Sequence, residues 1–228
     1  MNIFKKQKIN RFVSLTFDDG LIKSAFKISD IITPHNATFY VVTGWIEPRQ
    51  VTITDYANIF HNHGSISDWK IIAQKGHEIG SHSFSHLKPE NSNTEKEYIQ
   101  SFDFINKFGD APYSMAMPYG LKFNKTLPYD SIRLCDGKKI FNSLEKIDLK
   151  NLTSFDPFEN GLTIERAIKK INETPSNSWI IIRAHGLDDD GFCPWPTDYF
   201  KKLYFYLMEN NFHIQTVRQM TSNIKLKF

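Results

Sequence analysis

Residues 11–20 read RFVSLTFDDG, an apolar run that stops at two aspartates and a glycine. Aromatic and β-branched residues favour a strand over Arg11–Phe17, whereas Asp18, Asp19 and Gly20 are residue types typical of a turn. Apolar residues at helical spacing follow over Ile22–Ile32 and stop before Pro34. The stretch therefore predicts a strand, a polar turn and a helix, the repeating unit of a parallel α/β fold.

The same alternation continues along the chain. We expect further strands over 37–43, 78–82, 113–117, 131–135, 179–184 and 212–217, and further helices over 67–76, 94–108, 163–171 and 198–208. The rest of 122–158 fits neither pattern clearly. With 228 residues and no shift in composition along them, the chain is predicted to be one domain over 1–228, with its parallel strands arranged in a barrel.

The composition excludes several classes of protein. With 40% hydrophobic and 23% charged residues, the chain is typical of soluble globular proteins, and no transmembrane segment is expected. The net charge of +3 is spread along the chain, so nucleic acid is not an expected partner. Cys135 and Cys193 are far apart and predicted to be free thiols, and residues 1–11 lack an apolar signal-peptide core. We therefore expect a cytoplasmic protein, or an extracytoplasmic one whose targeting segment has been removed.

Polar residues fall where predicted strands end. Asp18 and Asp19, His82, the Pro118–Gly120 turn and His185 each follow an apolar run. Since the carboxyl ends of parallel strands converge on one face of a barrel, these side chains are expected to meet there. Separately, the aspartates fit an ordinary turn and His185 a buried core histidine. Two histidines and a carboxylate together form the ligand set of a catalytic zinc site, with the second carboxylate available as a base.

Four segments resemble the polysaccharide deacetylase family, carbohydrate esterase family 4, in the family's order and over nearly the whole chain. They are Thr16–Gly20, the run Gly76–His86 that contains HSFSH, Pro118–Gly120 and Trp179–Gly186. The resemblance implies a distorted (β/α) barrel of seven or eight parallel strands. It also implies a metal-dependent hydrolase that removes an N-acetyl group from an amino sugar in an oligosaccharide, polysaccharide or glycan precursor.

The resemblance also assigns roles to residues. Asp19, His82 and His86 are the expected ligands of one divalent ion, zinc first, with cobalt, nickel or iron also suited to such ligands. Asp18 is the expected base, His185 the general acid, and the backbone N–H of Tyr119 the donor to the oxyanion. The expected partner is an N-acetylated sugar.

The sequence departs from the family pattern in two places. Ala116 stands where the family usually has an arginine that pairs with the catalytic aspartate. The acidic residue that orients the general acid is not evident, and Asp156 is the candidate. Because side chains alternate along a strand, Arg183 is expected on the same side as His185, where it would pair with Asp18 or Glu78 and replace the missing arginine.

Other residues carry two interpretations. His61 and His63 can belong to a second metal site or, more simply, to a solvated loop, and Asp188–Asp190 fits a solvated loop as well. Phe192 and Trp195 follow His185 and can either stack on a sugar ring or pack in the core. Two alternative functions stay open: a catalytically inactive carbohydrate-binding protein, and a hydrolase of another acyl bond, such as an O-acetyl ester or a non-sugar amide.

Overall fold

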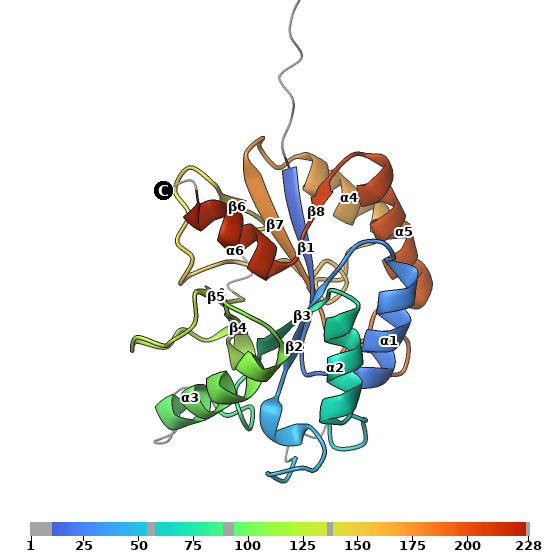
Figure 1. Cartoon of the computed structure of the whole chain (residues 1–228). Helices are drawn as coiled ribbons and strands as arrows, with labels where there is room; N and C mark the ends of the chain where they lie inside the picture. Colours follow the sequence, from blue (N-terminus) through green and yellow to red (C-terminus); the bar gives the residue numbers. More distant parts are fainter. Residues whose placement is uncertain (1–10, 54–57, 89–93, 136–138, 227–228) are drawn as a thin grey trace, which may run out of the picture.

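The computed structural model describes residues 11–53, 58–88, 94–135 and 139–226, and the basic segment 1–10 lies outside this description. Figure 1 shows a curved sheet with helices around it. The strands are β1 (Arg11–Phe17), β2 (Thr38–Val41), β3 (Glu78–Ser81), β4 (Ser114–Ala116), β5 (Ser131–Arg133), β6 (Asn142–Ser143), β7 (Ser178–Ala184) and β8 (His213–Ile214). The helices are α1 (Ile22–Ile31), α2 (Ile66–Gln74), α3 (Thr94–Ile105), α4 (Ile164–Asn172), α5 (Thr197–Glu209) and α6 (Val217–Lys225).

The sheet is a parallel barrel with one antiparallel strand. Its eight strands follow the order β5-β4-β3-β2-β1-β7-β6, and β8 pairs with β1. All the pairings are parallel except that of β6 with β7. The distorted barrel is therefore confirmed, with β6 as an unpredicted antiparallel addition. None of the described helices is both long enough and apolar enough to cross a bilayer.

A short segment, 152–155, lies between the two ends of the curved sheet. Leu152 forms a bridge with Arg133 of β5, and Phe155 forms one with Ile182 of β7. The backbone N–H of Leu134 donates to the carbonyl of Leu152 at 2.7 Å, and that of Phe155 donates to Ile181 at 2.8 Å. This segment closes the barrel and ends immediately before Asp156.

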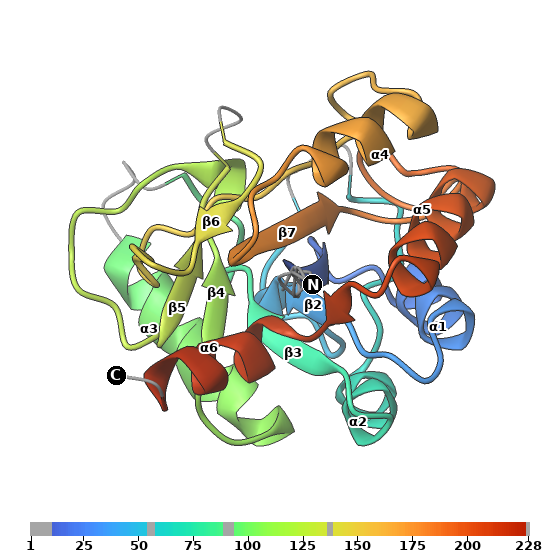
Figure 2. The same cartoon turned by 90° about the horizontal axis from the view of Figure 1, so that it is seen from above.

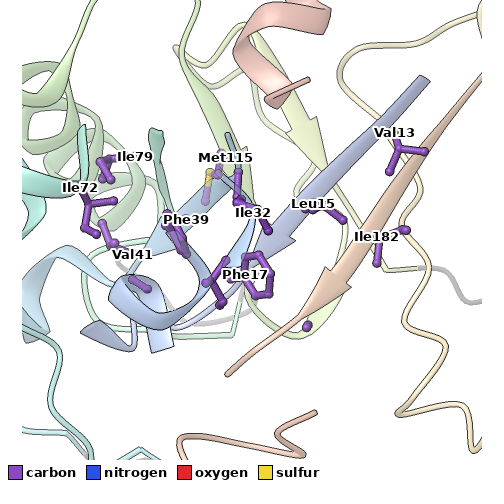
Figure 3. Close-up of a cluster of buried hydrophobic side chains, with 14 of the residues drawn as sticks. Val13, Leu15, Phe17, Ile32, Phe39, Val41, Ile72, Ile79, Met115 and Ile182 are labelled. Atoms are coloured by element: carbon purple, nitrogen blue, oxygen red, sulfur yellow. The ribbon is translucent and has the colours of Figure 1, made fainter. Parts of the chain in front are cut away.

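Alternating side chains give the barrel an apolar outside and a more polar inside. Val13, Leu15 and Phe17 of β1 belong to the outer hydrophobic core, which lies under the helices (Figure 3). Figure 2 shows α1, α2, α4 and α5 at the right of the view and α3 at the left, beside β4 and β5. The inner face carries Ser14 and Thr16, whose alternation with apolar residues matches the two-residue period of a strand. Polar side chains at the strand ends therefore continue the polar inner face of the barrel.

The strand predicted over 212–217 is shortened to β8, and the helix α6, which was not predicted, begins at Val217. Strand β8 is limited to two residues, and Thr216 then caps α6 with a reciprocal capping box that includes Gln219. The buried carboxylate of Glu78, at the start of β3, accepts the N–H of Arg218 at 2.7 Å. Helix α6 lies at the end where the strands begin (Figure 1), opposite the expected site.

Candidate active site

The strand ends surround a pocket of about 490 Å³. Its lining includes all seven residues that the sequence nominated for catalysis or metal binding: Asp18, Asp19, His82, His86, Tyr119, Arg183 and His185. They come from the ends of β1, β3, β4 and β7, as expected for converging parallel strands. The pocket is thus built where the sequence placed it.

The turn after β1 presents its two carboxylates differently. Asp18 continues β1, and its N–H donates to the carbonyl of Ala184 at 3.0 Å. Asp19 and Gly20 both have φ of 69°, a left-handed conformation that aspartate tolerates better than most residues. A Cβ on Gly20 would lie 3.1 Å from Val41, so glycine also suits the close approach to β2. Because the chain turns at Asp19, the side chains of Asp18 and Asp19 have different surroundings and can serve different roles.

Asp19, His82 and His86 form a group that can hold a metal ion. Oδ1 of Asp19 lies 3.4 Å from Nε2 of His82 and 3.7 Å from Nε2 of His86. This oxygen is buried and has no hydrogen-bond partner in the described part of the chain. Burial alone would raise the pKa of Asp19, but the neighbouring histidines hold it well below its ordinary value. Such a carboxylate oxygen facing two imidazole nitrogens fits a divalent cation.

Hydrogen bonds fix the two histidines in this geometry. Nδ1 of His82 donates to the carbonyl of Ala116 at 2.8 Å, which leaves Nε2 as the lone-pair nitrogen towards Asp19. The turn between the histidines is held by Glu97, which accepts the N–H and the hydroxyl of Ser85 at 2.8 and 2.7 Å. His86 has φ of 59°, and its N–H donates to the hydroxyl of Ser83 at 3.0 Å. The HSFSH segment is thus preorganised around both imidazoles.

Arg133 of β5 supplies the charge that Ala116 lacks. Its Nη2 donates to both oxygens of Asp18 at 2.6 and 2.5 Å, and both side chains are buried. Ala116 and Arg133 are partners in the β4–β5 register, so the arginine reaches the same carboxylate from the neighbouring strand. Burial raises the pKa of Asp18, but Arg133 acts against it together with His82, His185 and Arg183, and the sum of their charges holds the pKa below its ordinary value.

The predicted pairing of Arg183 with Asp18 or Glu78 is wrong. Arg183 does share the pocket with His185, but its Nη2 pairs with Glu159 and lies 3.7 Å from Oδ2 of Asp156. The reason is the closing segment: the N–H of Arg183 donates to the carbonyl of Phe155 at 2.9 Å, which places these two acids beside it. Glu78 is engaged at the opposite end of the barrel.

Asp156 lies next to the general-acid candidate. Its Oδ1 accepts Nε1–H of Trp195 at 3.1 Å, while its buried Oδ2 has no hydrogen-bond partner among the described residues. Nδ1 of His185 is buried without a described partner as well. Burial raises the pKa of Asp156 above its ordinary value, although Arg183 and His185 oppose the rise. No hydrogen bond joins Asp156 and His185 in this geometry, and the assignment of Asp156 stays a prediction.

The two aromatic residues after His185 have different positions. Phe192 is 48% exposed, lines the pocket and meets the His185 ring edge-on with centroids 5.3 Å apart. Trp195 is buried and packs on Tyr199. On the other side of the pocket, the half-exposed ring of Tyr119 lies 4.7 Å from that of His86. Phe192 and Tyr119 therefore offer apolar surface to a ligand, whereas Trp195 supports the site from the core.

A family model described as polysaccharide deacetylase matches residues 5–133, more than half of the sequence. The chain belongs to the polysaccharide deacetylase family. The match includes Asp18, Asp19, both histidines and Arg133, and His185 lies beyond it.

The chain is similar to three known proteins, one in sequence and two in fold. The peptidoglycan-N-acetylglucosamine deacetylase PgdA of Listeria monocytogenes is 30% identical over 122 residues, which are 50% of this chain and 23% of that protein. The chain thus spans about a quarter of the length of the curated relative. The solved structure of the Bc1960 peptidoglycan N-acetylglucosamine deacetylase superposes with a TM-score of 0.58 at 19% identity, over 92% of this chain and 87% of the other. BA3943 of Bacillus anthracis, a pseudoenzyme of carbohydrate esterase family 4, gives a TM-score of 0.58 at 12% identity, over 94% and 66%.

Two loops that the sequence predicts to be solvated contain buried side chains in this deacetylase-family chain. His63 is buried, and its Nδ1 lies 3.0 Å from the carbonyl of Asp19. Nδ1 of His61 lies 3.2 Å from Asp190, which is buried and also accepts the N–H and hydroxyl of Ser24 at 2.9 and 2.6 Å. Only Asp188 and Asp189 of that run behave as predicted, in exposed ion pairs with lysines. Neither histidine belongs to a second metal group among the described residues.

Proposed function

We propose that this chain is a metal-dependent deacetylase that hydrolyses the N-acetyl group of an amino sugar in a glycan or glycan precursor. The observation that carries the proposal is the pocket itself. It combines an Asp–His–His ligand group with a separate buried aspartate that an arginine keeps ionised. A carboxylate held in this way next to a cation site is suited to take a proton from water.

The ligand group is the reason for proposing a metal. Oδ1 of Asp19 is a buried charged oxygen with no hydrogen-bond donor among the described residues, an arrangement that is costly unless a cation completes it. When bound, a divalent ion supplies Lewis acidity to the acetamide carbonyl and to the attacking water. Zinc is the first expectation for two imidazoles and one carboxylate.

The remaining steps belong to protein side chains. Asp18 accepts a proton from the attacking water, and Arg133 keeps its carboxylate ionised and oriented. The backbone N–H of Tyr119, carried over from the family's third motif, donates to the oxyanion of the tetrahedral intermediate. His185 donates a proton to the departing amine, so that the sugar leaves as an amine rather than as an amide anion.

The test is acetate release from a panel of N-acetylated amino-sugar substrates, including polymeric, lipid-linked and nucleotide-linked ones. We expect release by the zinc-loaded protein, loss of release after chelation, and recovery when Zn²⁺ is added back. The His82→Ala variant should bind less than one equivalent of zinc. Bound zinc without turnover on any N-acetyl or O-acetyl substrate would instead favour the inactive carbohydrate-binding protein, and faster turnover of O-acetyl substrates would favour the esterase.

A second prediction concerns Arg133, which pairs with Asp18 in place of an arginine at position 116. Arg133→Ala should lower kcat about 10- to 100-fold, the range expected when a hydrogen bond to a charged group is lost. Because burial then acts on Asp18 without its counter-charge, the pKa of Asp18 should rise, and the acidic limb of the pH–rate profile should move to higher pH.

The register offers an internal control for this prediction. In the double variant Ala116→Arg/Arg133→Ala, the guanidinium returns to the position that the family usually uses, on β4 and opposite position 133 in the register. Activity should recover relative to Arg133→Ala, and the acidic limb should return to lower pH. A double variant no better than the single one, or a fully active Arg133→Ala protein, would count against the role of Arg133.

A further inference from the structure

The second oxygen of Asp19 is held by a residue outside every motif considered above. Nδ2 of Asn58 donates to Oδ2 of Asp19 at 3.0 Å, and Asn58 is fully buried. Oδ1 of the same carboxylate faces His82 and His86 and has no hydrogen-bond partner within the part of the chain that the structure describes. The amide of Asn58 therefore distinguishes the two carboxylate oxygens and leaves one of them for an ion.

His63 connects the backbone of Asp19 to the backbone of Asn58. Its Nδ1 lies 3.0 Å from the carbonyl oxygen of Asp19, and its Nε2 lies 3.2 Å from that of Asn58. The ring is buried against Trp45, with centroids 4.8 Å apart. Nε1–H of Trp69 in turn donates to the carbonyl of His63 at 2.8 Å. The imidazole thus acts as a rigid spacer between the ligand turn and the loop that carries Asn58.

The contacts with Asn58 and His63 hold Asp19 in its left-handed backbone conformation. A left-handed φ of 69° in a residue other than glycine persists only when the surroundings impose it. One carboxylate oxygen and the carbonyl of Asp19 are both held by the 58–63 loop, from opposite ends of the residue. Rotation of the carboxylate would break the bond to Asn58, and relaxation of the turn would break the contact with His63.

We infer that Asn58 and His63 are positioning residues for the metal ligand Asp19, so that metal affinity depends on the 58–63 loop as well as on the three ligands. The inference rests on the metal site of the proposed function. Groups that hold a ligand from behind fix its orientation and its ionised state, and their loss typically costs about 10- to 100-fold in metal affinity. We expect Asn58 to contribute more than His63, because it touches the carboxylate itself.

The experiment measures the dissociation constant of Zn²⁺ by competition with a chromogenic chelator. Asn58→Leu removes the amide and keeps the shape of the side chain. We expect Kd for Zn²⁺ to rise about 10- to 100-fold, while the melting temperature of the metal-free protein stays close to that of the wild type. Asn62→Ala is the matched control: it lies in the same loop, loses one hydrogen bond, from the N–H of Gly64, and does not contact Asp19. Its Kd should be unchanged.

The outcomes separate this inference from the proposed function. A folded Asn58→Leu protein with wild-type Kd, or an equal rise in Asn62→Ala, would overturn the role of Asn58 and leave the metal site intact. A wild-type protein that binds no Zn²⁺ would overturn the metal site and this inference together. If Asn58→Leu does not fold, Asn58→Ser replaces it, and its Kd should rise in the same direction.

Discussion

Replacing Asp18 by asparagine is expected to lower kcat on an N-acetylated sugar by about 100- to 10,000-fold, the usual contribution of a positioned general base. The amide keeps the shape of the carboxylate but cannot take a proton from water. Zinc content should be unchanged, because the ligand group consists of Asp19, His82 and His86 and does not include Asp18.

Stability must be measured beside activity in this variant. Arg133 is buried against Asp18, and loss of the negative charge leaves a buried cation without its counter-ion, which costs about 3–5 kcal/mol in comparable cases. Assays therefore belong well below the melting temperature of the variant. Asp189→Asn is a suitable control, since it also removes one carboxylate, from an exposed pair with Lys23, and should leave kcat unaltered. Near-normal turnover in a folded, zinc-loaded Asp18→Asn protein would exclude Asp18 as the base.

Much of the fold could be predicted because its signals are local. Strand β1 has the predicted bounds, and the predicted strand at 179–184 differs from β7 by one residue. Helix α6 was not predicted, although it too has a local signal, the capping box formed by Thr216 and Gln219. The closing segment 152–155 gave no such signal. Its pairing is limited to isolated bridges with strands distant in sequence, and those depend on the assembled barrel.

The residues of the site likewise fall into those with a local sequence signal and those whose role depends on the assembled barrel. Residues at strand ends were placed correctly, since parallel strands bring their carboxyl ends together whatever the details of packing. Arg133 was missed because its role depends on which strand lies beside β4, and that is a matter of register rather than of spacing. For Arg183, the direction of the side chain was right and its partner wrong, because alternation along a strand says nothing about the loop that lies next to it. Asn58 has no sequence signal at all, and only the structure shows its contact with Asp19.

The role of His185 as general acid can be tested by comparing how its loss affects two kinds of substrate. An amine is a poor leaving group unless it is protonated, so His185→Ala should lower kcat on an N-acetyl sugar by about 100- to 10,000-fold. A nitrophenyl acetate releases a stabilised phenolate that needs no proton. Its hydrolysis should therefore be affected far less.

The comparison with Asp18 makes this prediction specific. A base that activates water serves both substrates, so Asp18→Asn should impair amide and aryl ester alike, whereas His185→Ala should impair the amide selectively. Phe192→Leu is a control for packing, because it alters the ring that meets His185 edge-on and leaves the imidazole in place. Because His185 lines the pocket at 9% exposure, its removal opens space that water can fill, and zinc content should be checked in each variant. Equal losses on both substrates in a zinc-loaded His185→Ala protein would assign His185 to the attack on the carbonyl rather than to the departure of the amine.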